Sequence, residues 1–359
     1  MKIDLIGLLR QAVECAASDL FIISGCPLSY KINSRICPVA DEMLRGYRLK
    51  PEDTKSCLEQ IYSLSTVRSM EHFLETGDDD FSFSIDGLGR FRCNTYMQRG
   101  SMAAVLRMVG FHLPDPAELH IPESVMGLIR NKKGLVLITG SAGSGKSTTL
   151  ACMIDRINHT RNCHIITIED PIEFLHRHDV SIVSQREVSH DTQGYVPALR
   201  AALRQAPDVI LLGEMRDYET ITTAMTAAET GQLVLSTLHT IGAANTVDRI
   251  IDVFPPGQQQ QIRVQLSMVL QAVVSQQLVP ATDGTLIPAF EIMLVNSAIR
   301  TMIRESKIHQ IDNAIYSASC EGMIAMDTSL YNLYKQGVIS QETAMIYATN
   351  PEGLEKKML

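Results

Sequence analysis

Residues 134–150 constrain the fold of this 359-residue chain more than any other stretch. They read GLVLITGSAGSGKSTTL, which is an apolar run, a turn rich in glycine and serine, and a segment compatible with a helix. Gly140, Gly145, Lys146 and Ser147 fill the pattern G-x-x-x-x-G-K-[ST], in which backbone N–H groups surround phosphate oxygens. A chance glycine-rich loop needs no strand before it and no helix after it. The stretch therefore predicts a buried strand, a phosphate loop and a helix whose positive end faces the phosphates.

The loop pattern also gives a role to each of its residues. The lysine reaches the β- and γ-phosphates, and the hydroxyl of the serine after it is the expected ligand of Mg²⁺. We therefore expect ATP and Mg²⁺ at this loop. The expected nucleotide-binding residues are Gly140, Gly143, Ser144, Gly145, Lys146, Ser147 and Thr148.

Helix and strand patterns alternate after residue 121. Apolar strand candidates at 135–138, 164–168, 209–212 and 233–237 are separated by helix candidates at 147–158, 196–205 and 218–229. Such alternation predicts an α/β fold with a parallel sheet and helical crossovers. Ligands of such sheets bind beyond the carboxyl ends of the strands. We therefore expect the segments that follow these strands to line one pocket.

Charged side chains follow these strands, and they suit ATP hydrolysis, which needs a metal, a carboxylate that orients water and positive charge. We interpret Glu214 as the water-activating carboxylate; an exposed strand end is the alternative. Glu169, Asp170 and Glu173 form a second acidic cluster, in which Asp170 or Glu173 suits the Mg²⁺ of the loop serine through water. His239 is a candidate sensor of the γ-phosphate, and a structural hydrogen bond is its alternative role.

The sequence shows no obvious arginine finger within the pocket itself. An arginine finger is worth ~10³–10⁵ in rate, so an efficient ATPase needs one from elsewhere. Arg90, Arg92, Arg99 and Arg107 crowd the end of the N-terminal part of the chain. They are either surface charges in ion pairs or the arginines that a neighbouring subunit supplies.

The chain is long enough for two domains. Residues 1–110 predict a smaller α/β domain with an antiparallel sheet. Its expected elements are helices at 3–17 and 51–74, strands at 81–85 and 90–96, and a turn at 78–80. Residues 111–122 contain three prolines and are the expected linker. Residues 123–359 form the second domain, and its last third is expected to be mostly helical, with a helix at 258–278 among others.

The composition disfavours several other classes of protein. The net charge of −8 argues against a general nucleic-acid binder. No apolar run approaches the ~20 residues of a membrane span, and Asp4, Arg10 and Glu14 interrupt the segment that a signal peptide would keep apolar. The eight cysteines include no C-x-x-C pair, which disfavours a zinc cluster. We therefore expect a soluble cytoplasmic protein.

Several motifs resemble those of the secretion ATPases. Residues 167–174 (TIEDPIEF) resemble the aspartate box, residues 203–217 (LRQAPDVILLGEMRD) the atypical Walker B signature, and residues 230–240 (TGQLVLSTLHT) the histidine box. Residues 298–305 (AIRTMIRE) are similar to the A-I-R-x-L-I-R-E helix of the PilT-type pilus retraction ATPases. This resemblance covers nearly the whole chain, although Gln232 stands where the family has the first histidine of its histidine box.

The resemblance implies a hexameric ring of subunits that join a PAS-like N-terminal domain to a RecA-like P-loop ATPase domain with a helical C-terminal region. It implies ATP between the two domains, a place at the inner face of the cytoplasmic membrane, and pilus retraction through an inner-membrane platform protein, with related pilus ATPases as further partners. It carries the trans-acting arginines to Arg92 and Arg107, and the catalytic glutamates to Glu169, Glu173 and Glu214.

Two alternatives to a retraction motor remain at the level of sequence. One is a pilus assembly or secretion ATPase of the same superfamily, and the other is a nucleotide-dependent regulatory protein with little turnover. The intact Lys146, Ser147 and Glu214 argue against the regulatory protein. Arg300 and Arg304 lie one turn apart and need a partner, which is either acidic, within the ring or on the pilus base, or inside the protein itself.

Overall fold

The computed structural model describes residues 3–32, 35–40, 44, 46–65, 68–109, 113–317 and 322–358. The chain divides into two compact units. The N-terminal unit contains Met1–His112 and Glu173–Leu175, and the C-terminal unit contains Leu113–Ile172 and His176–Leu359. The division falls within the expected linker, of which residues 111 and 112 lie outside the described residues.

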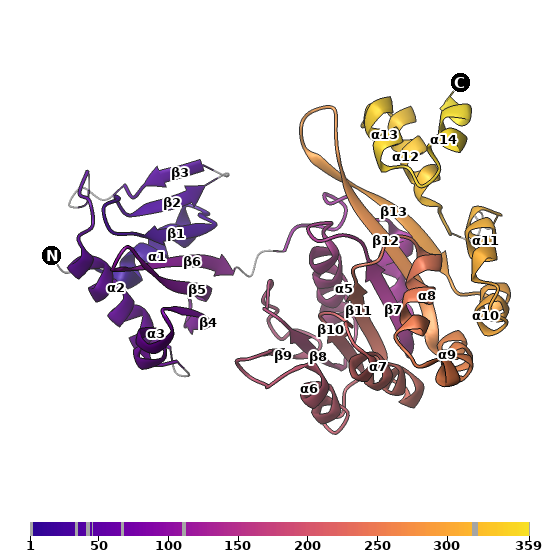
Figure 1. The fold of residues 1–359 in the computed structure, drawn as a ribbon, viewed down its shortest axis with the longest axis horizontal. Helices are drawn as coiled ribbons and strands as arrows, with labels where there is room; N and C mark the ends of the chain where they lie inside the picture. Colours follow the sequence, from indigo (N-terminus) through magenta and orange to yellow (C-terminus); the bar gives the residue numbers. More distant parts are fainter. Residues whose placement is uncertain are drawn as a thin grey trace. The chain divides into compact units, whose positions relative to one another are not determined.

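In the described part of the N-terminal unit, six strands form an antiparallel sheet in the order β3-β2-β1-β6-β5-β4. The strands are β1 (Asp19–Ile22), β2 (Ser29–Ile32), β3 (Arg35–Pro38), β4 (Asp78–Ile85), β5 (Gly89–Gln98) and β6 (Ser101–Val109). Helices α1 (Leu5–Glu14), α2 (Pro51–Leu64) and α3 (Met70–Thr76) accompany the sheet (Figure 1). Phe91 and Cys93 of β5 point into a core shared with α1 and α2, whereas Arg92 between them faces the other side.

Two expectations for this unit are wrong. Residues 78–80 belong to β4 instead of a turn, because their charges are matched: buried Asp79 accepts a hydrogen bond from Tyr62 Oη at 3.2 Å. Asp80 pairs with Arg92 on β5. The helix expected at 51–74 is divided, since α2 ends at Leu64 and α3 begins at Met70.

Within the described residues of the C-terminal unit, seven strands form a sheet in the order β13-β12-β7-β11-β10-β8-β9. They are β7 (Gly134–Thr139), β8 (His164–Glu169), β9 (Ile182–Glu187), β10 (Val209–Leu212), β11 (Leu233–Leu238), β12 (Leu270–Pro280) and β13 (Leu286–Leu294). Each neighbouring pair is parallel except β12 and β13. The expected parallel α/β sheet is confirmed, and β9 and β13 extend it at its two edges.

Helices cover both faces of this sheet (Figure 1). They are α4 (Glu123–Met126), α5 (Lys146–Thr160), α6 (Tyr195–Ala202), α7 (Tyr218–Thr230), α8 (Ala243–Asp252), α9 (Pro256–Val269), α10 (Ser297–Arg304), α11 (Ile311–Ser317), α12 (Met326–Lys335), α13 (Gln341–Tyr347) and α14 (Pro351–Met358), with 3₁₀ turns at Gly127–Arg130 and Ile308–Gln310. Side chains of β7 alternate between the two cores: Leu135 and Leu137 pack with α6 to α11, and Val136 and Ile138 pack with α4 and α5.

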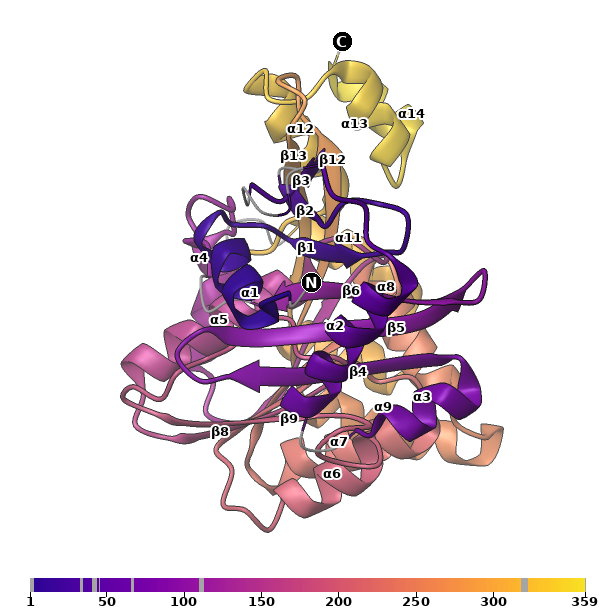
Figure 2. The same ribbon diagram turned by 90° about the vertical axis from the view of Figure 1, so that its left-hand side faces the viewer.

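The helix expected at 258–278 is wrong beyond residue 269. The chain leaves α9 at Val269 and enters β12 at Leu270 with no loop between them. β12 pairs with β7 on one side and with β13 on the other, so long-range pairing decides its conformation. Helices α12 to α14 form a small core of their own against the far part of the β12–β13 hairpin, as Figures 1 and 2 show.

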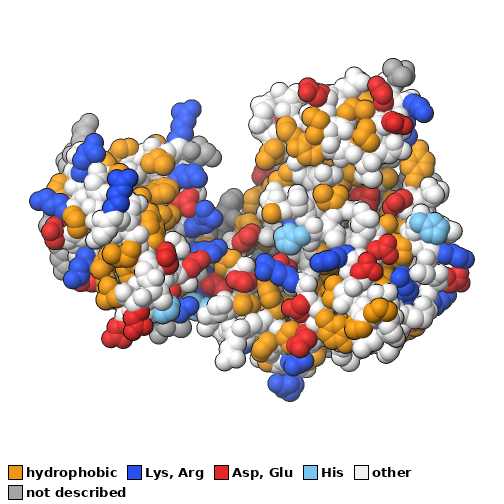
Figure 3. Space-filling view, viewed as in Figure 1, with side chains coloured by type: hydrophobic (Ala, Val, Ile, Leu, Met, Phe, Trp, Pro, Cys, Tyr) orange, Lys and Arg blue, Asp and Glu red, His pale blue; other side chains and the backbone are white. Residues whose placement is uncertain are grey.

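Charges of both signs share the face of the C-terminal unit that is seen in Figure 3. Lys and Arg side chains are interspersed with Asp and Glu side chains on the visible face of the C-terminal unit (Figure 3). Among the described residues, every helix is too short or too polar to cross a lipid bilayer.

Candidate functional site

The phosphate loop joins β7 to α5 at the carboxyl edge of the sheet. Gly140, Gly143 and Gly145 have φ of +142°, +76° and +86°, and residues other than glycine rarely adopt such positive φ values. A Cβ at Gly140 would lie 2.2 Å from the carbonyl oxygen of Gln276, so β12 presses directly against the loop. The glycines of the motif are therefore required by backbone conformation and by this close approach.

Lys146 begins α5 and is buried. Its Nζ donates hydrogen bonds to the carbonyl oxygens of Gly140 at 2.9 Å and Ser141 at 2.7 Å, which holds the ammonium over the loop. Ser144 is buried, and its Oγ has no hydrogen-bond partner among the residues that the structure describes. A phosphate at the amino end of α5 would meet an ammonium, a spare hydroxyl and unsatisfied backbone N–H groups.

The side chains at this loop show whether Mg²⁺, the metal expected from the sequence, fits the site. Ser147 is exposed in the first turn of α5, beside half-buried Thr148. Hydroxyl and carboxylate oxygens are the ligands that Mg²⁺ prefers, and it usually takes few of them together with phosphate oxygens and water. The residues therefore fit Mg²⁺ bound with a nucleotide.

A small cavity of about 200 Å³ lies beside the loop. Its lining combines polar residues, among them Glu118, His120, Thr148 and Gln276, with apolar side chains. Thr149 Oγ1 donates to Gln276 Oε1 at 2.8 Å, which fixes the glutamine against α5. The apolar side chains, Ile121, Leu278 and Leu286 among them, suit a flat apolar group such as a nucleobase.

Glu214 lies just after β10, at the same edge of the sheet as the loop. Its backbone is fixed by its neighbours, because Gly213 N donates to Ile168 O at 2.8 Å and Met215 N donates to Thr237 O at 3.1 Å. Only 10% of the Glu214 side chain is exposed. The carboxylate is thus held between β8 and β11 and shielded from bulk water.

Two side chains, those of Arg216 and His239, contact the Glu214 carboxylate. Arg216 binds Oε1, and His239 Nε2 lies 3.3 Å from Oε2. The hydrogen bond and the charge of Glu214 raise the pKa of Arg216. Burial, together with the charge of Glu214, raises the pKa of the nearby Tyr195 phenol, which stays protonated. The structure brings Glu214 and His239 together, as expected from the strand order.

The second acidic cluster is only partly gathered at this edge. Glu169 ends β8, and its Oε1 accepts hydrogen bonds from Thr167 Oγ1 at 2.6 Å and Gln185 Nε2 at 3.3 Å. Asp170 is exposed. Glu173 is exposed and is grouped with the N-terminal unit.

Gln232 lies at the opposite edge of the sheet from the phosphate loop. It precedes β11, its Oε1 accepts a hydrogen bond from Thr230 at 2.9 Å, and its carbonyl accepts one from the N–H of Gly134, at the start of β7. His239, at the far end of the same strand, is the histidine-box residue that reaches Glu214. The hydrogen bonds of Gln232 therefore lie at the amino edge of the sheet.

Arg92 and Arg107 are cross-strand neighbours on β5 and β6 of the N-terminal unit. Arg92 donates to both oxygens of Asp80, at 3.1 and 2.6 Å, and Arg107 Nε donates to Asp19 at 3.0 Å. The four side chains line a groove of about 310 Å³ on this sheet. The exposed fractions of the two arginine side chains are 39% and 65%, so both guanidinium groups remain accessible.

The two arginines of α10 have different surroundings. Arg300 Nη1 donates to the carbonyl oxygens of Ser267 at 2.6 Å and Met268 at 3.0 Å, the last carbonyls of α9. Arg304 is exposed, with Thr301 on its own helix as the contact. Arg300 therefore finds its partner inside the chain, in the negative end of a helix, and Arg304 faces solvent.

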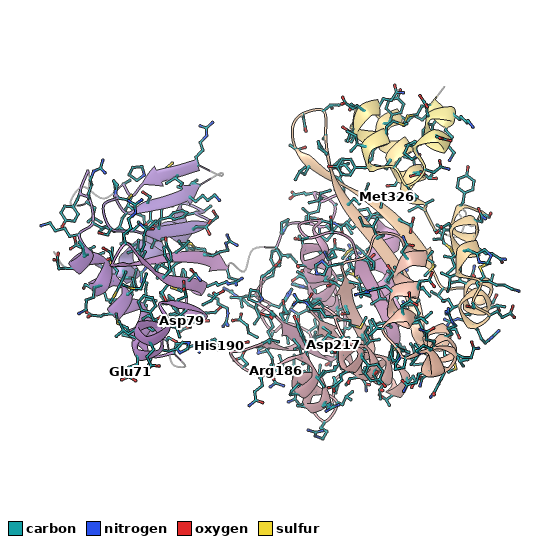
Figure 4. The ribbon with its side chains drawn as sticks, in the orientation of Figure 1. Glu71, Asp79, Arg186, His190, Asp217 and Met326 are labelled. Atoms are coloured by element: carbon teal, nitrogen blue, oxygen red, sulfur yellow. The ribbon has the colours of Figure 1, made fainter. Side chains whose placement is uncertain are left out.

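Sequence reasoning missed three side chains of the site. Gln276 lies on β12, which the sequence pattern presents as helix. Tyr195 lies just before a helix candidate, and Arg216 lies in the Walker B stretch, in which only Glu214 is given a role. Arg216 has a signal in the sequence, because it stands two residues from Glu214 in the Walker B stretch. Asp217, labelled in Figure 4, accepts a hydrogen bond from Thr220 N and starts α7 directly after this cluster.

Comparison with known proteins gives consistent results. Residues 90–345 match the family of type II/IV secretion system proteins. The chain is 42% identical to the type IV pilus retraction ATPase PilT of Pseudomonas aeruginosa over 97% of this chain and 99% of that one. It is 40% identical to the type IV pilus ATPase PilU of the same organism, over 97% and 89%. The crystal structure of the pilus retraction motor PilT with bound ADP matches 99% of both chains at 46% identity, with a TM-score of 0.88.

Proposed function

Because the chain belongs to the family of type II/IV secretion system proteins, we propose that it hydrolyses ATP to power retraction of type IV pili. The observation that carries this function is the phosphate loop, with Glu214 and His239 at the same sheet edge, in a chain similar to PilT over nearly its whole length. The α10 sequence AIRTMIRE, whose second arginine is exposed, supports retraction over assembly or secretion.

In this function the chain's own groups divide the work. Backbone N–H groups of residues 140–148 bind the phosphates, and Lys146 exchanges its loop carbonyls for the β- and γ-phosphates. Glu214 takes a proton from the attacking water, and His239 holds the carboxylate in place. Ser147 would hold Mg²⁺, which would supply positive charge against the phosphates. Glu169 supports the same edge through its hydrogen bonds to Thr167 and Gln185.

The positive charge at the transferred phosphate comes from a neighbouring subunit in this proposal. Arg92 and Arg107 lie side by side, and their guanidinium groups are accessible. Their ion pairs with Asp80 and Asp19 can be exchanged for contacts with a phosphate. A homohexamer places such arginines at each subunit boundary, and Glu173 joins the site in the same assembly. The ring works at the inner face of the cytoplasmic membrane, against a membrane platform protein and alongside related pilus ATPases.

A deletion strain of the source organism tests this function. Retraction predicts abundant surface pili and no twitching, both reversed by the wild-type gene. Lys146→Ala is the matched negative control, since it removes the charged donor of the loop and leaves the surface unchanged. Loss of surface pili in the deletion strain would instead assign the chain to assembly, and normal pili with normal motility would exclude both.

A further inference from the structure

A row of polar side chains crosses the sheet next to the phosphate loop. Thr139 on β7 is in register with Ser275 on β12, and Ser275 is in register with Glu291 on β13. Paired residues of neighbouring strands point to the same face of a sheet. Thr139 is the last residue before Gly140, so the row begins at the phosphate loop and ends at a glutamate that is 7% exposed.

The row holds the segment between His239 and α8, which we call the histidine loop (residues 239–242). The N–H of Gly242 donates to Ser275 Oγ at 3.0 Å, and the N–H of Ala243, the first residue of α8, donates to Glu291 Oε1 at 2.6 Å. Two successive amides, the last of the loop and the first of α8, are therefore bound by two neighbouring side chains of the row. Since His239 contacts Glu214, the row reaches the hydrolytic carboxylate through one short loop.

The strand that carries Glu291 also contacts the segment before a second helix, α12. The backbone N–H of Met326, the first residue of α12, lowers the pKa of Glu291, so the carboxylate lies near the amino end of this helix. Ile292 beside it exchanges two backbone hydrogen bonds with Ile324, at 2.8 and 3.1 Å, so α12 is fastened to β13 at this point. Met326 is labelled in Figure 4, at the base of the C-terminal helices. Glu291 and its neighbour Ile292 thus tie β13 to the amino end of α8 and to the segment that leads into α12.

The burial of Glu291 is unfavourable for stability. Burial raises its pKa, the amides of Ala243 and Met326 oppose that shift, and the charges of Asp312 and Asp327 add to it. A buried ionisable group is commonly no more stable than a well-packed apolar residue, so stability alone does not account for a glutamate here. Its two helix ends belong to different parts of the unit, the catalytic edge and the C-terminal helices.

We propose that Glu291 is a positioning residue that sets the histidine loop for hydrolysis and couples the movement of this loop to α12–α14. This inference rests on the proposed ATPase function. When His239 shifts with the bound nucleotide, the N–H of Ala243 shifts with it, and Glu291 carries the displacement to β13. The backbone hydrogen bonds between Ile292 and Ile324 then pass it to the segment that leads into α12. Ser275 fixes the loop from the β12 side and takes no part in the contact with α12.

The test compares three variants of the full chain. Glu291→Gln keeps the size but removes the charge, so the hydrogen bond from the N–H of Ala243 is no longer charge-assisted. Asp327→Asn is the matched control: Asp327 accepts from the N–H groups of Thr349 and Asn350 and has no hydrogen bond to the histidine loop. Ser275→Ala weakens the loop alone. Steady-state ATPase kinetics and amide hydrogen exchange with and without a non-hydrolysable ATP analogue are measured for each.

Glu291→Gln should lower kcat about tenfold or more, as expected for a lost charge-assisted hydrogen bond, with KM for ATP within about twofold. It should also abolish the analogue-induced change in exchange at residues 326–358. Ser275→Ala should lower kcat and keep that change, and Asp327→Asn should keep kcat within about twofold. If Glu291→Gln does not fold, the response of wild type and Ser275→Ala to the analogue carries the test.

Three outcomes overturn the inference. They are a wild-type kcat in Glu291→Gln, an equal loss of kcat in Asp327→Asn, and a wild-type chain in which the analogue changes exchange at 239–243 but not at 326–358. Failure of the proposed function is separate, because a wild-type chain without ATP hydrolysis is seen in the kinetics before any variant is compared.

Discussion

Exchange of Glu214 for glutamine should remove ATP hydrolysis and preserve ATP binding. The side chain is 10% exposed and is held by Arg216 and His239, so glutamine fits the same space without the charge that accepts a proton. A general base contributes ~10²–10⁴ in rate, which corresponds to ~3–5 kcal/mol. Phosphate release under saturating ATP measures the loss, and equilibrium binding of ATP should stay within about twofold of wild type.

Replacement of His239 should lower the rate less than replacement of Glu214, and its effect should depend on the presence of Glu214. His239→Ala removes the group 3.3 Å from Glu214 Oε2, and a hydrogen bond to a charged group is worth ~1.5–3 kcal/mol, or about 10–150-fold in rate. Once Glu214 is replaced, His239 has no carboxylate to position. The double variant should therefore be no slower than Glu214→Gln, which gives a coupling energy of ~1.5–3 kcal/mol.

Gln232→Ala is the control for the histidine box, since Gln232 lies at the opposite edge of the sheet and should leave kcat unchanged. The reasoning is refuted if the losses of the two single variants add to within ~0.5 kcal/mol in the double variant. It is refuted as well if Glu214→Gln retains more than about a tenth of the wild-type rate, because another group would then be the base.

The phosphate loop, the interface and one histidine give further expected outcomes. Lys146→Ala should weaken ATP binding by about tenfold or more, and unchanged binding in a titration would place the nucleotide elsewhere. Rings mixed from Arg92→Ala and Lys146→Ala subunits should hydrolyse ATP at a rate that differs from the weighted mean, whereas a proportional rate argues against action between subunits. Gly140→Ala should abolish ATP binding, because its Cβ would lie 2.2 Å from the Gln276 carbonyl oxygen at a φ of +142°; normal binding contradicts this packing. The pKa of His159 is raised above 6.5, first by a hydrogen bond to a backbone carbonyl, so its stabilisation is complete below pH 6.5 and is lost as the pH rises through the raised value. The Tm difference between wild type and His159→Gln should shrink over that range, and a constant difference excludes His159 as the source.

The central sheet could be predicted because local signals agree there. The runs that became β7, β8, β10 and β11 are apolar almost throughout, which is typical of strands covered on both faces, and each is followed by a helix or a turn. A fixed order of parallel strands then brings Glu214 and His239 to one edge. This part of the site follows from sequence pattern alone.

The edges of the sheet could not be predicted in the same way. Residues 270–280 continue an apolar run that begins in α9, and periodicity does not distinguish a buried helix from a buried strand. The pairing of β12 with β7, more than a hundred residues away in the chain, decides the question. Gln276 and Ser275 were therefore missed together with their strand. At the other edge, β9 begins with exposed Ile182 and lacks the alternation of a half-buried strand.

In the N-terminal unit, the three aspartates at 78–80 are typical of a turn when read locally. They are tolerated in a strand because Tyr62 and Arg92 reach them from α2 and β5. Such matching depends on side chains that are 12 or more residues away in sequence, so propensity alone gives the wrong structure.

The contact between Arg300 and the end of α9 has a mechanical consequence. Any load that a partner applies to exposed Arg304 enters α10, and Arg300 passes it to the last carbonyls of α9. Since α9 runs into β12 without a loop, tension continues along β12 and across its ladder to β7, the strand that carries the phosphate loop. A force applied at Arg304 would therefore strain the phosphate loop. A motor built in this way would hydrolyse ATP more slowly under load.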